Sequence, residues 1–386
     1  MKTPLLLAAV VLALPSSLGA QTNDSHASAE SRPAPLERID DLVRGILARH
    51  VRVPGLTGAV VKDGVPYAVG VAGLRRYDRD VKATIDDQWH LGSCTKAMTA
   101  TLAARLAAKK TFRWDVDVQT AFAKAKIEVH EGYRSVPISA LLVNRGGVPS
   151  DLNFDGLWGK LWEKKGTPTE QRKELARAVL GRPPAVAPEK RFLYSNAGFA
   201  LAGLAMEIET GKAWEDLMRE EIFAPLGIAS AGFGSPGKAE AVDQPAGHKF
   251  EAGERKVFPP GPDSDNPPAI GPGGTVHMSM TDWARFAAAH AIGEKGESAF
   301  LDADLFKALH TPPAEADYAM GWVVTTRPWG GRVITHNGSN TMWFSAVWIA
   351  PDKRFAVLAA ANIGGDEGSK AVDALCAAMI GKFGPR

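Results

Sequence analysis

The segment His90-Leu91-Gly92-Ser93-Cys94-Thr95-Lys96 opens an alanine-rich run, 97–110. If that run is a helix, Ser93 and Lys96 lie three positions apart on one face. A serine hydroxyl becomes a nucleophile when an amine of lowered pKa takes its proton. The start of a helix also presents free N–H groups to a developing oxyanion. Because the same pattern also arises as an N-cap serine followed by a surface lysine, it predicts only a candidate nucleophile and base.

Strand signals occur at both ends of the chain. Two apolar runs, 57–62 and 67–73, are joined by Asp63-Gly64, which predicts a tight hairpin. After them we expect mainly helix and loop, until strand signals return near the C-terminus. The expected late strands are 319–326, 332–335, 342–350 and 354–361.

Early and late strands therefore have to meet, with a helical region inserted between them. This predicts an α/β (α+β) fold with an antiparallel sheet flanked by helices. We expect a sheet-and-helix domain, formed by 36–90 and 281–386, and a mainly helical lobe, 91–280, with a cleft between them. Helices are expected at 36–50, 93–110, 170–180, 197–210, 214–222, 281–290 and 369–383. The proline- and glycine-rich segment 251–274 is expected to be an irregular loop, either a functional rim or a flexible excursion.

The first 20 residues predict a secretory signal. Lys2 is followed by an apolar core, 5–14, and by small residues at 17–20. The apolar core is too short to span a bilayer, and no cysteine follows it for a lipid anchor. We therefore expect a polar leader at 21–35 and an exported protein, periplasmic or extracellular, with no stable membrane anchor.

Composition narrows the classes of partner. The chain has 45 Lys and Arg against 43 Asp and Glu, spread without a basic block, so nucleic acid is not favoured as a partner. The two cysteines, Cys94 and Cys376, are expected to be buried free thiols, with a disulfide as the alternative. The histidines lack the spacing of metal ligands, so neither a metal nor a cofactor is indicated.

Two later motifs carry further polar groups. Tyr194 and Asn196, two apart in extended chain, would point the same way: the phenol for proton transfer, the amide for a substrate carbonyl. In His336-Asn337-Gly338-Ser339, Gly338 would let a substrate lie close to a strand, and the Ser339 N–H would face the Ser93 N–H across an oxyanion hole. His336 would bind a substrate carboxylate or adjust the proton balance. The structural alternatives are a helix cap, a packed tyrosine and a turn glycine.

Together, Ser93-x-x-Lys96, Tyr194-x-Asn196 and His336-x-Gly338 resemble the serine β-lactamase and penicillin-binding-protein superfamily. Within it, the chain is most similar to the class C β-lactamase-related hydrolases, which include D,D-peptidases, D-aminopeptidases and β-lactamase-like esterases. The resemblance extends over residues 36–382. It implies a β-lactamase/transpeptidase-like fold and a serine hydrolase that forms an acyl-enzyme on an ester, a D-amino-acid peptide of peptidoglycan type, or a β-lactam.

The resemblance also implies roles for individual residues. Ser93 would be acylated, Lys96 would exchange its proton, and Tyr194 would be a second acid/base. Asn196 would hold the substrate carbonyl, and the Ser93 and Ser339 N–H groups would form the oxyanion hole. It leaves open which of Lys96 and Tyr194 is the acylation base, since the two would titrate as a coupled pair.

Two departures from the family pattern bear on the substrate. Many relatives have a histidine followed by Thr-Ser or Thr-Ala where this chain has Asn144-Arg145-Gly146, and class C β-lactamases have a lysine at the position of His336. A neutral histidine suits a β-lactam carboxylate less well than a permanent cation. We therefore expect esterase or peptidase activity over efficient β-lactam turnover. The alternatives are a true β-lactamase and a non-catalytic penicillin- or peptidoglycan-binding protein; the oligomeric state is left open.

Overall fold

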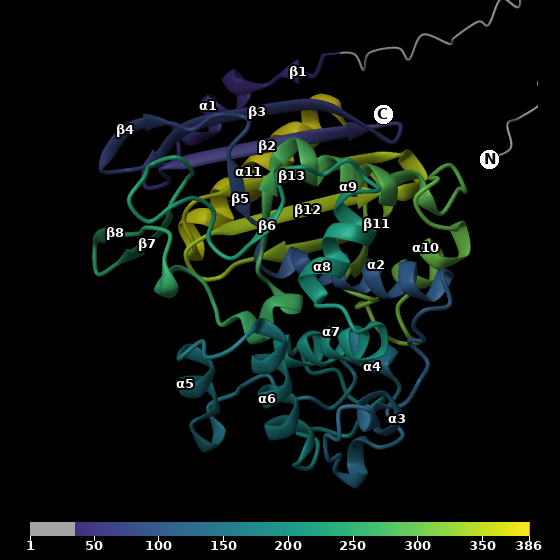
Figure 1. The fold of residues 1–386 in the computed structure, drawn as a ribbon. Coiled ribbons are helices and arrows are strands. Elements are labelled where there is room, and N and C mark those ends of the chain that lie inside the picture. The colour runs from purple at the N-terminus through teal and green to yellow at the C-terminus, as the bar shows by residue number, and fades with distance from the viewer. Residues whose placement is uncertain (1–34, 386) are drawn as a thin grey trace, which may run out of the picture. The chain divides into compact units, whose positions relative to one another are not determined.

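The computed structural model describes residues 35–385, and strands from both ends of the chain join in its eight-stranded sheet (Figure 1). The strand order is β1-β3-β2-β13-β12-β11-β10, with β4 beside β3. The sheet strands are β1 (Glu37–Arg38), β2 (Gly55–Lys62), β3 (Val65–Arg76), β4 (Arg79–Lys82), β10 (Val323–Arg327), β11 (Gly331–Gly338), β12 (Phe344–Ala350) and β13 (Phe355–Ala361). The early and late strands meet where β2 pairs antiparallel with β13. The expected sheet is confirmed.

The β2–β3 hairpin turns at the predicted Asp63-Gly64. Both residues have positive φ, 49° and 77°, as a type I′ turn requires. Lys62 then pairs with Val65 across the turn. The turn sets the register of the first hairpin, and β2 presents its other edge to β13.

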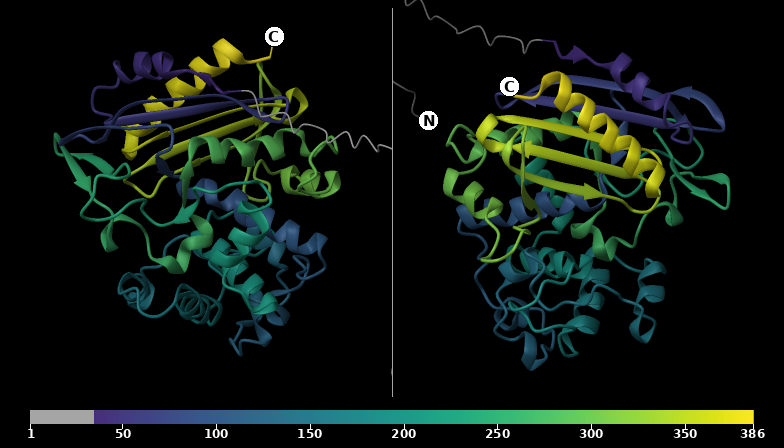
Figure 2. Two further views of the ribbon diagram at one scale, coloured as in Figure 1. Left: turned by 45° about the horizontal axis from the view of Figure 1, so that its top comes forward. Right: turned by 180° about the vertical axis from the view of Figure 1, so that it is seen from behind.

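Helices cover both faces of the sheet (Figure 2). On one face, α1 and α11 pack over a core that includes Val43, Val60, Val357 and Leu375. On the other, α9 packs against β2, β3, β12 and β13. Covered on both sides, β13 is buried along its whole length.

The helical elements follow the expected periodic segments, with small shifts at their ends. The α-helices are α1 (Asp40–Leu47), α2 (Thr95–Ala108), α3 (Val118–Ala123), α4 (Ile138–Leu142), α5 (Leu157–Trp162), α6 (Pro168–Leu180), α7 (Asn196–Thr210), α8 (Trp214–Met218), α9 (Met280–Gly293), α10 (Ala303–His310) and α11 (Gly365–Phe383). The short helical turns are η1 (Gly92–Cys94), η2 (Glu131–Tyr133), η3 (Phe154–Gly156), η4 (Arg219–Phe223), η5 (Pro262–Ser264), η6 (Pro268–Gly273) and η7 (Pro351–Lys353). Helix α7 is buried almost all round, as its apolar sequence predicts.

Three expectations were wrong. The stretch after residue 73, expected to be mainly helix and loop until strand signals return at 319, holds β4 as well as β5 (Gln88–His90), β6 (Gly232–Phe233), β7 (Gly247–Glu251), β8 (Glu254–Phe258) and β9 (Val276–Ser279). Segment 251–274, expected to be irregular, contains β8, η5 and η6. Helix α10 was not expected. Most of these strands are too short, and the β7–β8 hairpin too exposed, to show the alternation of apolar and polar residues that predicts a strand.

The division into a sheet-and-helix domain (36–90 and 281–386) and a helical lobe (91–280) stays a prediction. The predicted signal, 1–20, and all but the last residue of the predicted leader, 21–35, lie outside the described residues. Within the part of the chain that the structure describes, no helix is both long and apolar enough to cross a membrane.

Candidate active site

Ser93 lies in η1, the single turn that leads from β5 into α2. Its side chain is partly exposed, whereas almost every residue of α2 is buried. The alanines that predicted the helix also let it pack closely in the core, which fixes the direction of its first turn. A reactive hydroxyl is thus held at the surface end of a rigid element.

Lys96 projects from the first turn of α2 into a fully buried position. Its Nζ lies 3.1 Å from Ser93 Oγ, 2.6 Å from Asn196 Oδ1 and 2.6 Å from the Gly273 carbonyl oxygen. The last two atoms can only accept hydrogen bonds. A neutral amine has two hydrogens and one lone pair, so donating to both acceptors directs its lone pair at the Ser93 hydroxyl. The geometry suits removal of the serine proton.

Burial gives Lys96 the protonation state that this chemistry needs. It disfavours the ammonium and lowers the pKa of Lys96 to about 7. The residues described around it include no carboxylate paired with Nζ, and its hydrogen-bond partners are a hydroxyl, an amide oxygen and a carbonyl. A large share of Lys96 is therefore neutral near pH 7.

The ring of Tyr194, which lies in the segment that precedes α7, packs against the Lys96 amine. The lysine Nζ lies 4.7 Å from the centre of the tyrosine ring. Burial raises the pKa of Tyr194 to about 12, while interaction with the Ser93 side chain acts in the opposite direction. Tyr194 is thus a neutral phenol at pH 7, able to donate or relay a proton, whereas Lys96, with the lower pKa, is the group that is partly deprotonated and able to accept a proton near pH 7.

The cap of α7 explains why Asn196 faces the lysine. Ser195 is the N-cap, and its hydroxyl accepts from the Gly198 N–H at 3.1 Å. The capping alternative for Asn196 is therefore not realised. Its Oδ1 binds Lys96, and its Nδ2 donates no hydrogen bond to residues 35–385.

Asn144 belongs to the segment 144–146, which departs from the family pattern, and it positions the backbone around Tyr194. It adopts a left-handed conformation with φ 56°, and its Oδ1 accepts from the Ser195 N–H at 3.0 Å. Its carbonyl accepts from the Leu193 N–H at 2.8 Å. These two bonds hold the backbone on either side of Tyr194. The sequence marked Asn144 as unusual but gave no signal for this contact.

The end of β11 lies directly against the Ser93 turn. A Cβ on Gly338 would be 2.0 Å from the Leu91 oxygen and 2.7 Å from the Ser93 nitrogen, so only glycine fits there. Likewise, a Cβ on Gly92 would be 2.3 Å from the Ser339 nitrogen. Among residues 35–385, neither the Ser93 N–H nor the Ser339 N–H has a hydrogen-bond partner. Two free donors at one contact suit an oxyanion.

His336 is buried below this contact, with both ring nitrogens engaged. Its Nδ1 lies 2.5 Å from the Asn337 oxygen, an obligate acceptor, so this nitrogen carries the hydrogen. Its Nε2 then accepts from the Tyr318 hydroxyl at 3.0 Å. Burial, together with the charge of Lys96, lowers the pKa of His336 to about 4. His336 is neutral at pH 7, and its carboxylate-binding role stays a prediction.

Tyr318 is a site residue that sequence reasoning missed. Its ring meets that of Tyr194 edge-on, with centroids 6.3 Å apart. No motif surrounds Tyr318, so no sequence signal distinguished it from a core tyrosine. A cavity of about 560 Å³ opens beside this group, lined by Phe192, Tyr194, Tyr318 and His336 together with residues of β10, β11 and β12.

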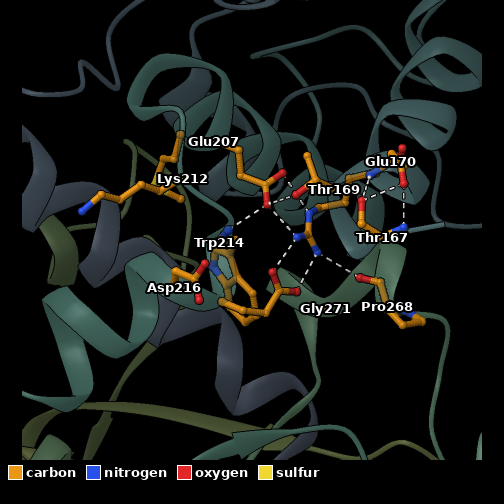
Figure 3. Close-up of polar contacts among 12 residues, drawn as sticks. Thr167, Thr169, Glu170, Glu207, Lys212, Trp214, Asp216, Pro268 and Gly271 are labelled. Carbon is orange, nitrogen blue, oxygen red and sulfur yellow. Dashed lines mark hydrogen bonds and ion pairs between the residues drawn. The ribbon is translucent and has the colours of Figure 1, made fainter.

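A buried ionic network (Figure 3) contacts the first residue of η6, the turn whose last residue, Gly273, directs its carbonyl at Lys96. Arg172 of α6, fully buried, binds Glu207 of α7 at 2.6 Å and Glu215 of α8 at 2.8 Å. Its NH1 also donates to the Pro268 carbonyl at 3.0 Å, at the start of η6. One guanidinium thus ties three helices to the turn that ends at Gly273.

The cysteines are free and buried, as expected. Burial raises the pKa of Cys94 to about 12, and its Sγ lies 3.4 Å from the His336 carbonyl oxygen. A protonated, enclosed thiol is a poor nucleophile. Cys94 packs beneath Ser93 and does not compete with it.

Comparison with known proteins fits this geometry. Residues 39–378 match the family model described as Beta-lactamase. "Penicillin-binding protein 4" of Amycolatopsis lactamdurans is 31% identical over 242 residues, which cover 62% of this chain and 59% of that protein. The chain thus spans about three fifths of the length of that curated relative.

Solved structures share the fold. An octameric penicillin-binding protein homologue from Pyrococcus abyssi superposes with a TM-score of 0.70 at 21% identity, covering 88% of this chain and 76% of that one. A D-amino acid amidase from Ochrobactrum anthropi SV3 gives 0.68 at 22% identity, covering 89% and 98%. With the family model matching most of its length, the chain belongs to the β-lactamase family, within the serine β-lactamase and penicillin-binding-protein superfamily.

Proposed function

We propose that this protein is an exported serine hydrolase that works through an acyl-enzyme on Ser93. The observation that carries the proposal is the fully buried Lys96 amine, held between two obligate acceptors with its remaining position toward Ser93 Oγ. Lys96 takes the serine proton as the hydroxyl attacks the substrate carbonyl. The Ser93 and Ser339 N–H groups receive the oxyanion.

Tyr194 completes the cycle as an acid. Its raised pKa supports a phenol that gives its proton to the leaving group during acylation. In deacylation the resulting phenolate takes a proton from the attacking water, while the Lys96 ammonium returns its proton to Ser93 Oγ. Asn196 keeps its Oδ1 on Lys96 and offers its Nδ2 to the substrate carbonyl. This assigns Lys96, and not Tyr194, as the acylation base.

The substrate we propose is an ester or a D-amino-acid amide or peptide. His336 stands where class C β-lactamases have a lysine, and both of its ring nitrogens are engaged within the protein, which supports weak recognition of a β-lactam carboxylate. The structural similarity to a D-amino acid amidase agrees with this choice. The cavity beside Tyr194, whose lining does not include Ser93, offers room next to the site for part of a substrate.

A panel of substrates tests the proposal. Steady-state and burst kinetics on a p-nitrophenyl ester, a D-amino-acid amide, a D-Ala-D-Ala peptide and nitrocefin compare the classes in one preparation. We expect turnover of the ester or of a D-amino-acid substrate, with nitrocefin slower. Nitrocefin turnover at the rate of a good ester would make the protein a β-lactamase. Stable acylation without turnover would make it a binding protein.

Export is tested separately by the N-terminal mass of the mature protein, which should begin at Gln21; retention of Met1 would contradict it.

A further inference from the structure

A buried histidine, aspartate and asparagine form a connected chain behind the two N–H groups of the candidate oxyanion hole. His90 ends β5, Asp265 lies between η5 and η6, and Asn340 follows β11. Their exposed fractions are 0%, 4% and 3%. Asp265 binds the other two, through Oδ2 to His90 Nε2 at 2.8 Å and through Oδ1 to Asn340 Nδ2 at 3.0 Å.

The His90 end of this chain fixes the backbone next to Ser93. Because the carboxylate oxygen accepts, the His90 hydrogen is on Nε2, and Nδ1 is an acceptor. The Gly92 N–H donates to that Nδ1 at 3.1 Å. Gly92 is held in a left-handed conformation with φ 48°, and its Cα faces the Ser339 nitrogen with no room for a Cβ. The residue before the first oxyanion donor is therefore anchored to Asp265.

The Asn340 end fixes the backbone next to Ser339. Asn340 Nδ2 donates to Asp265, and its Oδ1 accepts from the Met342 N–H at 3.1 Å. This closes the turn that leaves β11 immediately after the second donor. Asp265 also accepts a hydrogen bond from the Asn266 N–H at 2.8 Å. One carboxylate thus reaches the neighbours of both donors from segments far apart in the sequence.

We propose that Asp265, acting through His90 and Asn340, is a positioning residue that sets the separation of the Ser93 and Ser339 N–H groups. The inference rests on the proposed acyl-enzyme chemistry at Ser93. A buried carboxylate is costly unless it is fully hydrogen-bonded, and here its bonds to His90 and Asn340, beside the one from the Asn266 N–H, are directed to the two segments whose spacing an oxyanion hole requires. Asp265 touches no substrate in this scheme. It acts by holding the donors at the distance that suits the transition state.

The test replaces Asp265 by Asn, and separately Asn340 by Ala. The rate of Ser93 labelling by a fluorophosphonate, and kcat and KM on a p-nitrophenyl ester, are measured as a function of pH. We expect labelling rate and kcat to fall about 10- to 100-fold, less than the loss caused by deleting an oxyanion donor. We also expect KM to change less than about threefold, and the pH midpoint set by Lys96 to stay in place, because that lysine has no contact with Asp265.

Asp282→Asn is the matched control. Asp282 is 5% exposed and accepts from the Ala229 and Ser230 N–H groups, away from the Ser93 turn. We expect it to keep kcat within about threefold of the wild type. Equal losses in Asp265→Asn, Asn340→Ala and Asp282→Asn would overturn the positioning role, as would wild-type kcat in both test variants. If one test variant does not fold, the other decides. Failure of the proposed function looks different, because the wild type itself would then not be labelled.

Discussion

Lys96 Nζ has three neighbours but, as a neutral amine, only two hydrogens to donate. Asn196 Oδ1 and the Gly273 oxygen take both, so the lone pair is left for the Ser93 hydroxyl. Burial lowers the pKa of Lys96 to about 7, so that the amine can be neutral when it accepts the serine proton. The reactivity of the serine therefore depends on a lysine kept away from water and from carboxylates.

This predicts the acid side of the pH profile. Lys96 is an ammonium below its pKa and an amine above it, so activity that needs the amine is lost as pH falls through about 7. We expect kcat/KM to drop about tenfold per pH unit below that midpoint and to level off above it. Lys96→Arg, whose guanidinium stays protonated, should abolish acylation at every pH tested. A profile flat from pH 5 to 8 would rule out Lys96 as the base.

Tyr194 gives a second test at the scale of one residue. Because its phenol stays protonated, its contribution should be largest where the leaving group needs a proton. We expect Tyr194→Phe to cost about 10²- to 10⁴-fold in kcat on a D-amino-acid amide, and less than about tenfold on a p-nitrophenyl ester. Equal losses on both substrates would show that Tyr194 acts before the leaving group departs.

At the scale of elements, the site depends on β11 lying against the turn that carries Ser93. Gly338→Ala would place a methyl group 2.0 Å from the Leu91 oxygen, so the strand and the turn must separate. We expect the rate of Ser93 labelling to fall more than about 100-fold, as both oxyanion donors are displaced. In the control Gly381→Ala, in α11, nothing lies within 4 Å of the new methyl. This change should leave activity unaltered and raise stability by about 0.4–1 kcal/mol. Normal labelling of Gly338→Ala would contradict the contact.

The ionic network around Arg172 predicts a large effect on stability. Arg172→Ala leaves Glu207 and Glu215 without their cation in a buried setting (Figure 3). Urea denaturation should show a loss of about 3–5 kcal/mol in the free energy of unfolding. Arg177→Ala, at an exposed position of the same helix, should change it by less than about 0.5 kcal/mol. Similar values for the two variants would show that the buried network adds little.

The elements that the sequence predicted well are those whose own pattern decides their structure. The Asp63-Gly64 turn needs two positive φ angles, and α7 needs an apolar surface all round, so each is visible locally. The short strands β5 and β9 exist because they pair with each other across nearly two hundred residues, which no local pattern shows. Tyr318 and Asp265 could not be predicted for the same reason, since Tyr318 meets Tyr194 and Asp265 meets His90 from distant segments.

At the scale of the whole molecule, strands from early and late parts of the chain pair in one open sheet, and the candidate site lies where four segments far apart in the sequence meet. Ser93 comes from η1 and Lys96 from the start of α2, Tyr194 and Asn196 from the start of α7 and the residues before it, Gly273 from the end of η6, and Gly338 and Ser339 from the end of β11. The sequence shows the order of the motifs along the chain, but it does not show the distances between their side chains in space. Only the packing of α2, α7 and η6 brings the hydroxyl, the amine and the carbonyl into contact.

The most direct measurement is the intact mass of the purified protein after exposure to a fluorophosphonate, followed by peptide mapping. We expect one adduct per chain, on the peptide that contains Ser93, with no adduct on Ser93→Ala and none on Cys94. An unlabelled wild type, or a label that persists in Ser93→Ala, would contradict an activated Ser93 nucleophile.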